Sequence, residues 1–467
     1  MKILLVNPNS STDAASPPQV RVPYGILYPA STLENNGHEV QIVDRNTDPN
    51  GIEDVIRRFW PDLVGVSVMT GPCILDALFI SRLTKRISPD TRVVWGGVHP
   101  SLFPSMSASE ASVDYVVRRE GDFTVVELCE AICRGGDLRE VKGISYRTGD
   151  GICHTPDRPF LSNLDELPYP AWHLIDIEKY VGNRLDGRKY LSMNTSRGCP
   201  YCCAFCYNRA FNEFKWRGLS VERVVEQIHY LVSEYGIGFV EFLEDNFTVS
   251  KKRLLGICDS LIRDNVDILW YCESRVGFLE RETLIKMKRS GCSGIGFGVE
   301  SGSPRILKLI KKNITVDQTI QTFRLCKELE IMPDAYVMVG LPHETIDDFR
   351  MTLQLIETIP YRMCDLMVYR PYPGTELYDV CIAEGLFRPP GDLEAWAEIS
   401  DLHSAKFSVG QIPEAMIRSA KRKTLARNRC NSVVGAIRDA PLHRLAPRLP
   451  RFLFDTMYAA FRNHQGE

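Results

Sequence analysis

The sequence lacks any apolar run near the roughly 20 residues that a membrane-spanning helix needs. It also has no low-complexity tract and no repeat of 20–50 residues, which argues against solenoids and propellers. The first residues, MKILLVNPNS, lack the length and cleavage site of a signal peptide, so a cytoplasmic location is expected. With 467 residues, of which 44% are hydrophobic, the chain suits two or three globular domains.

The net charge is only −3, but the charge is unevenly distributed. From Ala415 to Glu467 there are eleven Lys or Arg and three acids, so the last part carries +8 and the first 414 residues carry −11. A solvated helix face with a loose tail explains this composition. A surface for an anionic partner explains it as well.

The first 135 residues alternate strand and helix patterns. The strand-like runs are KILLVNP, HEVQIVD, DLVGVSV, RVVWGG and VDYVVRR. Helical spacing appears between them, as in YGILYPASTLENNG, which ends on an Asn-Gly C-cap signal. Strands joined by helices of this length form right-handed crossovers and a parallel sheet. We therefore expect a doubly wound, Rossmann-like α/β domain over 1–135, with ligands beyond the carboxyl ends of its strands.

A second series of strands and helices follows a segment rich in Gly, Pro and Asp. The segment 136–188 is expected to be a linker or cap. Over 189–390, six strand-like runs alternate with helical patterns, which predicts a partial (β/α)6 barrel of the TIM type with its chemistry at the C-terminal strand ends. The six runs are KYLSMNTSRG, GFVEFLEDN, ILWYCESRV, GIGFGVES, DAYVMVG and DLMVYRPYP. The remainder, 391–467, reads as a helical, basic region.

Four of the fifteen cysteines fall within eight residues, in TSRGCPYCCAFCYNR. Cys199, Cys203 and Cys206 have the spacing C-x3-C-x2-C. Three thiolates on one loop can hold three irons of a [4Fe–4S] cluster and leave the fourth iron open. Zinc is the alternative, but it prefers four ligands in two separated pairs, and adjacent cysteines at 202 and 203 rarely both reach one ion. Cys202 receives no role.

This segment resembles the signature of the radical S-adenosylmethionine (SAM) superfamily, which has an aromatic residue before the third cysteine, here Phe205. The resemblance implies that the open iron binds the methionine part of SAM. It also implies that one electron from the reduced cluster cleaves SAM to methionine and a 5′-deoxyadenosyl radical.

Further motifs lie where this superfamily places its SAM contacts. Glu244 and Asp245 in FLEDNF are expected near the methionine amino group, although Asp245 also suits a turn. Arg275 is a candidate for the carboxylate, and an ordinary buried ion pair is its alternative. Glu300 and Ser301 in GFGVESGSP resemble the ribose-binding position. VMVGLPHET, with Gly340, resembles the motif beside adenine.

Residues 1–135 resemble the cobalamin-binding domain found before the barrel in one class of these enzymes. That class includes the anaerobic magnesium-protoporphyrin cyclase and several methylases. The resemblance is carried by NPN, PYGILYPASTLENNGHEV, SVMTG, GGVHP and REGD. It implies that a corrin contacts residues in the loops after the strands, namely Asn7, Ser67, Thr70, Gly96, Gly97, Glu120 and Gly121.

The cobalamin motif D-x-H-x-x-G, which supplies an axial histidine, is absent: of the nine histidines only His403 has Asp two residues before it, and Lys406 stands where the motif requires glycine. Members of the radical class often lack the motif and still bind cobalamin, while some relatives have lost the cofactor. Cobalamin bound without a histidine is therefore expected. His99 is the alternative axial ligand, although a loop histidine is usually solvated.

The leading interpretation is a cobalamin-dependent radical SAM methyltransferase that acts on an unactivated carbon of a secondary metabolite, lipid or tetrapyrrole. A radical cyclase, dehydratase or rearrangement enzyme is the alternative, and a non-catalytic corrinoid or Fe–S sensor fits less well. The expected partners are a small-molecule or lipid-like substrate and a one-electron reductant of the flavodoxin or ferredoxin type. Nucleic acid is not expected.

The C-terminal tail is a candidate for peripheral membrane contact. Large apolar residues recur at helical spacing in RFLFDTMYAAF, near Arg444, Arg448, Arg451 and Arg462. An amphipathic, basic helix can lie in a membrane interface. The alternative is that this helix packs its apolar side on the barrel.

Overall fold

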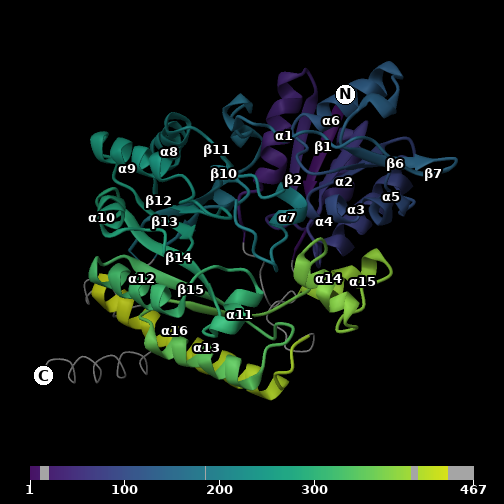
Figure 1. Ribbon diagram of the computed structural model, residues 1–467. Coiled ribbons are helices and arrows are strands. Elements are labelled where there is room, and N and C mark those ends of the chain that lie inside the picture. Colours follow the sequence, from purple (N-terminus) through teal and green to yellow (C-terminus); the bar gives the residue numbers. More distant parts are fainter. Residues whose placement is uncertain (11–19, 185, 401–408, 440–467) are drawn as a thin grey trace, which may run out of the picture.

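The computed structural model describes residues 1–10, 20–184, 186–400 and 409–439 (Figure 1). Two seven-stranded sheets organise this part of the chain. The first sheet belongs to the N-terminal region and the second to the middle of the chain. This architecture confirms the predicted fold class.

The first sheet contains all five predicted strands, in the order β2-β1-β3-β4-β5. These five strands are parallel. Their bounds are β1 (Lys2–Asn7), β2 (Glu39–Asp44), β3 (Leu63–Ser67), β4 (Arg92–Gly96) and β5 (Tyr115–Val117). In this order β2 is added on one side of β1, and β3 to β5 are added on its other side. The strand order therefore reverses between β1 and β3, and open α/β sheets bind ligands at such a point.

Both faces of the first sheet are buried under helices. Alternate side chains of a strand point to opposite faces, so neighbouring residues enter different cores. Leu5 packs with α1 and α6, whereas Leu4 packs with α2 and α3. The helices are α1 (Tyr24–Asn35), α2 (Ile52–Phe59), α3 (Cys73–Ile87) and α6 (Thr124–Arg134), with the short α4 (Val98–Leu102) and α5 (Pro104–Ser109) after β4. This arrangement is the doubly wound one that the sequence predicts.

A hairpin extends the first sheet beyond β5. Its strands, β6 (Ile144–Thr148) and β7 (Gly151–His154), are antiparallel to their neighbours. They lie inside the segment expected to be a linker or cap, so that segment adds to the first sheet as well as connecting the two. The proposed domain limits stay predictions. Short 3-10 turns make up much of the rest of the segment, at Leu138–Glu140, Leu164–Glu166, Trp172–Leu174 and Ile177–Lys179.

The second sheet curls into a partial barrel with the six predicted strands in parallel. Its order is β16-β15-β14-β13-β12-β9-β8, and only β8 is antiparallel. The strands are β8 (Gly182–Asn183), β9 (Lys189–Met193), β12 (Ile237–Phe242), β13 (Leu269–Ser274), β14 (Cys292–Glu300), β15 (Met332–Val339) and β16 (Cys364–Val368). Two small strands, β10 (Ser196–Arg197) and β11 (Arg217–Gly218), pair outside it, and α7 (Asn208–Asn212) lies between them in sequence.

Helices cover one face of this second sheet, as Figure 1 shows for its teal and green part. They are α8 (Val221–Tyr235), α9 (Lys251–Arg263), α10 (Arg281–Arg289), α11 (Pro304–Leu309), α12 (Val316–Glu328) and α13 (Ile346–Thr358). Phe297 of β14 meets Phe323 of α12 with ring centroids 5.5 Å apart. The sheet therefore buries its apolar face against this helical layer.

The C-terminal region contacts both sheets. The short α14 (Glu376–Ala383) and α15 (Leu393–Ala397) follow β16, and α15 packs on α3 of the first sheet. The long α16 (Glu414–Asp439) runs beside the barrel, where the amide of Asn428 bonds both backbone groups of Cys364. No helix in the described ranges is long and apolar enough to cross a membrane. The candidate membrane helix in RFLFDTMYAAF, and its arginines, lie outside the described residues.

Candidate active site

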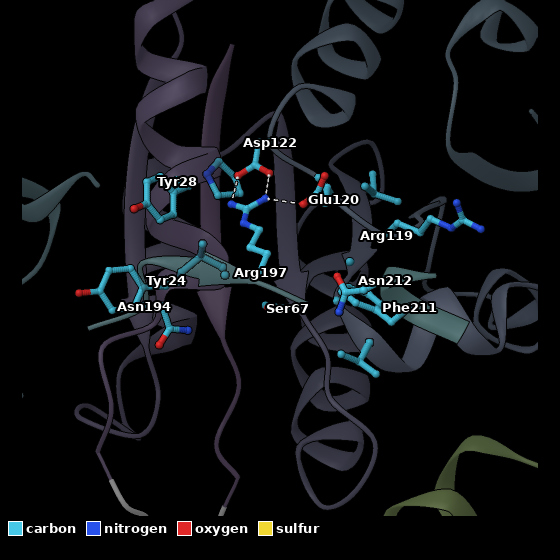
Figure 2. A pocket seen from close by; sticks show the side chains of 18 of the residues that line it. Tyr24, Tyr28, Ser67, Arg119, Glu120, Asp122, Asn194, Arg197, Phe211 and Asn212 are labelled. Carbon is cyan, nitrogen blue, oxygen red and sulfur yellow. Dashed lines mark hydrogen bonds and ion pairs between the residues drawn. The ribbon is translucent and has the colours of Figure 1, made fainter. Parts of the chain in front are cut away.

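A pocket of about 410 Å³ lies between the carboxyl ends of the two sheets (Figure 2). Leu5 of β1 and Val66 of β3 line it, so it sits at the point where the first sheet reverses its strand order. The volume lies within the usual range of ligand pockets. Seven of the predicted cofactor-binding residues line this pocket: Ser67, Gly96, Gly97, Glu120, Gly121, Glu244 and Asp245.

The loop after β4 approaches the sheet so closely that only glycine fits at position 97. Gly97 has φ of 99°, a conformation that side chains rarely adopt. A Cβ atom there would stand 2.8 Å from the carbonyl oxygen of Val68. The glycine therefore leaves backbone, with no side chain, at this part of the pocket wall, as expected where a large ligand lies against a sheet edge.

An ion-pair cluster joins the two regions at the pocket. Arg197 of β10 points toward Asp122 and Glu120 of the first region, at 2.7 Å and 3.0 Å, as Figure 2 shows. Arg217 of β11 bonds the same Glu120 oxygen at 2.7 Å. Burial opposes the charge of Arg197, but Asp122 and Glu120 outweigh it and raise the pKa of the guanidinium above its ordinary value. Glu120, predicted as a corrin contact, thus also holds the regions together.

Tyrosines form another wall of the pocket. Tyr24 and Tyr28 project from α1, and Asn194 follows β9. The Tyr24 hydroxyl donates to the carbonyl of Ser192 at 3.2 Å. Burial raises the pKa of Tyr28 to about 12, so its phenol stays neutral. Five pocket residues were not predicted as site residues, although all of them lie inside the sequence motifs quoted above: Tyr24, Tyr28, Asp122, Asn194 and Arg197.

The cysteine loop lies beside the pocket, between β10 and α7. Cys199, Cys203 and Cys206 are partly buried free thiols, whereas Cys202 is exposed. The loop is anchored by its backbone, since Ala204 N donates to the carbonyl of Ile310 at 2.9 Å and Cys206 N donates to that of Cys203 at 3.1 Å. Its form is thus set by the chain around it.

The three thiols fit a cluster better than a single ion. Burial, followed by the nearby Asp245, Cys203 and Cys199, raises the pKa of Cys206 to about 12, so positive irons would stabilise these groups as thiolates. Within the described ranges, no three His, Cys, Asp or Glu side chains are arranged to hold one metal ion. In a [4Fe–4S] cluster each thiolate binds a different iron, so its ligands need not converge on one point. The geometry therefore gives no support to zinc.

Two predicted SAM contacts lie close to this loop. The Arg275 guanidinium stands 3.6 Å from the sulfur of Cys203 and stacks 4.4 Å from the ring centre of Tyr201. Asp245 opens into the pocket and accepts a bond from the Tyr207 hydroxyl at 3.2 Å. The protein packed around Asp245 raises the pKa of its carboxyl. Their position leaves both residues as proposals for binding SAM.

Other predicted SAM contacts have structural partners in addition. Glu244 accepts from the backbone N of Thr195 at 2.5 Å, and also from the hydroxyls of Thr195 and Ser196. Glu244 therefore supports the turn that leads into the cysteine loop. A role for it in binding SAM stays a prediction.

The ribose and adenine candidates are also held by protein groups. Glu300 forms a buried ion pair with Lys312 at 2.6 Å, and the hydroxyl of Ser301 bonds that of Thr352 at 3.1 Å. Gly340 has φ of 75° and donates to the carboxylate of Glu344 at 2.5 Å. None of the three candidates lines the pocket. Their contacts with SAM stay predictions.

Two predicted corrin contacts and the candidate axial ligand lie outside the pocket. Asn7 donates to Asp44 at 3.0 Å, and Thr70 bonds the His99 ring at 3.3 Å. His99 is fully buried and packs against Phe103 and Trp396. Burial lowers its pKa to about 4. No histidine is among the described residues that line the pocket, so the structure argues against His99 as an axial ligand.

Family models match both regions. A model described as the radical SAM superfamily matches residues 193–356, and one described as a B12 binding domain matches residues 11–129. The two matches cover the barrel with its cysteine loop and the doubly wound sheet.

Known proteins resemble the chain over most of its length. An uncharacterized methyltransferase of Pyrococcus horikoshii is 35% identical over 393 residues, which are 83% of this chain and 84% of the relative. The anaerobic magnesium-protoporphyrin IX monomethyl ester cyclase of Rubrivivax gelatinosus is 28% identical and covers 81% of this chain and 69% of its own. The structure of the radical SAM methyltransferase TsrM of Kitasatospora setae, with cobalamin and a [4Fe–4S] cluster bound, superposes with a TM-score of 0.69 at 21% identity. That superposition covers 82% of this chain and 75% of TsrM, and it shows a shared fold.

Proposed function

Because the chain belongs to the radical SAM superfamily and carries an N-terminal B12 binding domain, we propose that it methylates an unactivated carbon of a small substrate with cobalamin as methyl donor. It is a B12-dependent radical SAM enzyme, and its cofactors are a [4Fe–4S] cluster, SAM and cobalamin. Enzymes of this superfamily need an external reductant and a small substrate. A flavodoxin or ferredoxin is proposed as the reductant.

One observation carries the proposal, namely a pocket that both regions share beside the cysteine loop. Ser67 and Gly97 reach it from the first sheet, while Asp245 reaches it from the second. When bound, the cluster and SAM supply a deoxyadenosyl radical, and cobalamin supplies a methyl group. Methyl transfer to a carbon radical requires that SAM and cobalamin both lie within reach of one substrate. A pocket shared by the two regions would meet this requirement.

The residues of this chain would contribute binding and position. Cys199, Cys203 and Cys206 would hold three irons, and Arg275 would bring positive charge to the loop. The backbone of Gly96, Gly97 and Gly121 would lie against the corrin. The buried wall of Tyr24 and Tyr28 would keep water away from a reactive radical.

A radical reaction without methyl transfer is the second candidate, favoured by the match to the cyclase of Rubrivivax gelatinosus. The two candidates differ in the fate of the SAM methyl group. Only the methyltransferase has to load that methyl onto cobalamin.

The test uses the full chain, reconstituted without oxygen with iron, sulfide and hydroxocobalamin, then reduced and given SAM with a deuterated methyl group. We expect 5′-deoxyadenosine together with a deuterated methyl group on cobalamin, both measured by mass spectrometry. Deoxyadenosine without labelled cobalamin would favour the cyclase-type reaction. No deoxyadenosine at all would contradict the radical function.

A further inference from the structure

The second sheet has one apolar face and one polar face. Phe242, Cys272 and Ile295 are in register on the face that the helices cover. On the opposite face, Glu241 is in register with Tyr271, and Glu273 is in register with Gly296. The concave side of the barrel thus carries carboxylates and phenols where a core would carry aliphatic side chains.

Glycine on β14 lets these polar groups meet. A Cβ atom on Gly296 would stand 2.2 Å from the hydroxyl oxygen of Tyr271. With glycine there, the hydroxyls of Tyr271 and Tyr336 bond across β14 at 3.0 Å, and the Tyr336 hydroxyl donates to Glu273 at 3.3 Å. The polar face is therefore a connected hydrogen-bonding surface.

This face adjoins the shared pocket. Ser192 of β9 is in register with Glu241, and its hydroxyl accepts from the backbone N of Val22 at 3.4 Å. Tyr24, which lines the pocket, contacts the same serine. Asp245 of the pocket is also close enough to raise the pKa of Glu273. A substrate in the pocket is thus within reach of the polar face.

The two glutamates are held in an unfavourable environment for negative charge. Burial raises the pKa of Glu273 to about 7, and it also raises the pKa of Glu241 above its ordinary value. Both stay half-buried, so a ligand can reach them. The positive charge of Arg21, an exposed residue, lowers the pKa of both glutamates, but by less than burial raises it. Arg362 and Arg184 also lower the pKa of Glu241, and they are paired with Asp334 and Asp186 respectively.

We propose that the polar face of the barrel recognises the substrate of the proposed methylation through Glu241 and Glu273, and that this substrate carries a protonated amine. The inference rests on the proposed function for the existence of a substrate at this site. A carboxylate offers only hydrogen-bond acceptors, so it matches the three N–H donors of an ammonium group. An anionic substrate would be repelled by the glutamates, and a hydrocarbon lipid would cover them without satisfying their remaining acceptor sites.

The test measures the binding of three probes of equal size to the reconstituted holoenzyme: benzylamine, benzyl alcohol and benzoate. Ligand-observed NMR titration in the presence of SAM gives each dissociation constant. We expect benzylamine to bind about tenfold more tightly than benzyl alcohol, as for a charge-assisted hydrogen bond, and benzoate not to bind. In the variant Glu241→Gln/Glu273→Gln, benzylamine and benzyl alcohol should bind with about the same dissociation constant.

The matched control is Glu280→Gln, which removes an exposed glutamate of the same region that pairs with Lys251. It should keep the full preference. The single variants Glu241→Gln and Glu273→Gln should each lose part of it, so the test does not depend on the double variant folding. Equal binding of the probes, tightest binding of benzoate, or an unchanged preference in the variants would each overturn the inference.

This outcome is separate from that of the proposed function, because the binding measurement needs no radical. Preference for the amine without labelled cobalamin would leave the amine site standing and contradict methyl transfer. Labelled cobalamin without the preference would do the reverse.

Discussion

The two sheets share the same alternation of strands and helices but use their faces differently. In the first sheet, Leu4 and Leu5 are neighbours and both are buried, under helices on opposite sides. In the second sheet, Val240 is fully buried while its neighbour Glu241 belongs to a polar face. A sheet with two cores can bind a ligand only at its edge, whereas a curled sheet with one core also offers a face. The first region is therefore suited to hold a large cofactor at its rim, and the second to enclose the reacting molecules.

The largest effect is expected at the cysteine loop, because the proposed radical chemistry depends on this part of the second region. Replacing Cys199, Cys203 and Cys206 with Ala should abolish iron binding and deoxyadenosine formation, because no thiolate remains for the cluster. The wild type should hold about four irons per chain and absorb at about 400 nm. Cys202→Ala is the control and should keep both properties. Cluster and cleavage in the triple variant would contradict the assignment.

Urea unfolding of variants measures how much each face of the two sheets contributes to stability. Leu4→Ala and Leu5→Ala should each lower the unfolding free energy by about 2–5 kcal/mol, because each opens a cavity in a different core. Val240→Ala should also destabilise the protein, by about 1–3 kcal/mol. Glu241→Ala should change the free energy by less than about 1 kcal/mol, because it removes a carboxylate that is poorly solvated. A large loss for Glu241→Ala would mean that the polar face is a structural core.

Titration distinguishes the regions too, since every carboxyl whose pKa is clearly raised among the described residues belongs to the second one: Glu241, Asp245, Glu273 and Glu344. Burial raises the pKa of Glu344 to about 7, against about 4.3 in an unfolded chain. Between these values the folded state binds more protons, so this group makes stability fall as pH rises to about 7 and level off above.

Glu344→Gln should remove that fall, because the amide keeps an acceptor for the backbone N–H groups of Gly340 and Leu341 without carrying charge. At pH 8 the variant should be more stable than the wild type by up to about 3 kcal/mol, and at pH 4 the two should be alike. Urea unfolding across pH 4–8 measures the difference. Parallel curves for both proteins would show that Glu344 is not the source.

A smaller effect than those at Leu4, Leu5 and Glu344 is expected at the junction of the regions. Arg197→Gln should leave Asp122 and Glu120 with less compensation and cost about 2 kcal/mol, below the value for a fully buried pair because Arg197 is partly exposed. The variant should also bind hydroxocobalamin more weakly, measured by its absorbance. Lys215→Gln, which removes an exposed pair with Glu213, should be near neutral. Equal effects of the two changes would mean that the cluster does not hold the pocket together.

Sequence patterns predicted the fold because its strands are short, apolar and separated by helices, as in KILLVNP and DLVGVSV. They also predicted the cysteine loop, whose spacing is local. They did not reveal the β6–β7 hairpin, since Arg147 and Thr148 face solvent and interrupt the apolar alternation. Local pattern says little about which strand a polar, exposed segment will pair with.

The pocket was foreseen at the strand ends but not in its contacts. Arg197 meets Asp122 across 75 residues of sequence, and no spacing rule relates the two. The task of Glu244 in holding Thr195 could not be foreseen either, because it depends on how two turns meet in space. Single-residue roles at a junction of two regions follow from tertiary packing.

The packing of α15 on α3 has a consequence for the order in which the protein is made. Trp396 is fully buried against Phe103 of the first region, at 4.6 Å between ring centroids, and Glu394 pairs with Arg82 at 2.9 Å. The ribosome finishes β5 roughly 275 residues before it adds α15, an interval of tens of seconds at about 5–20 residues per second. During that time the surface of the nascent first region that α15 later covers, at α3 and Phe103, stays exposed. Chaperones bind exposed apolar surfaces of this kind. A fragment ending soon after β5 would keep that patch permanently.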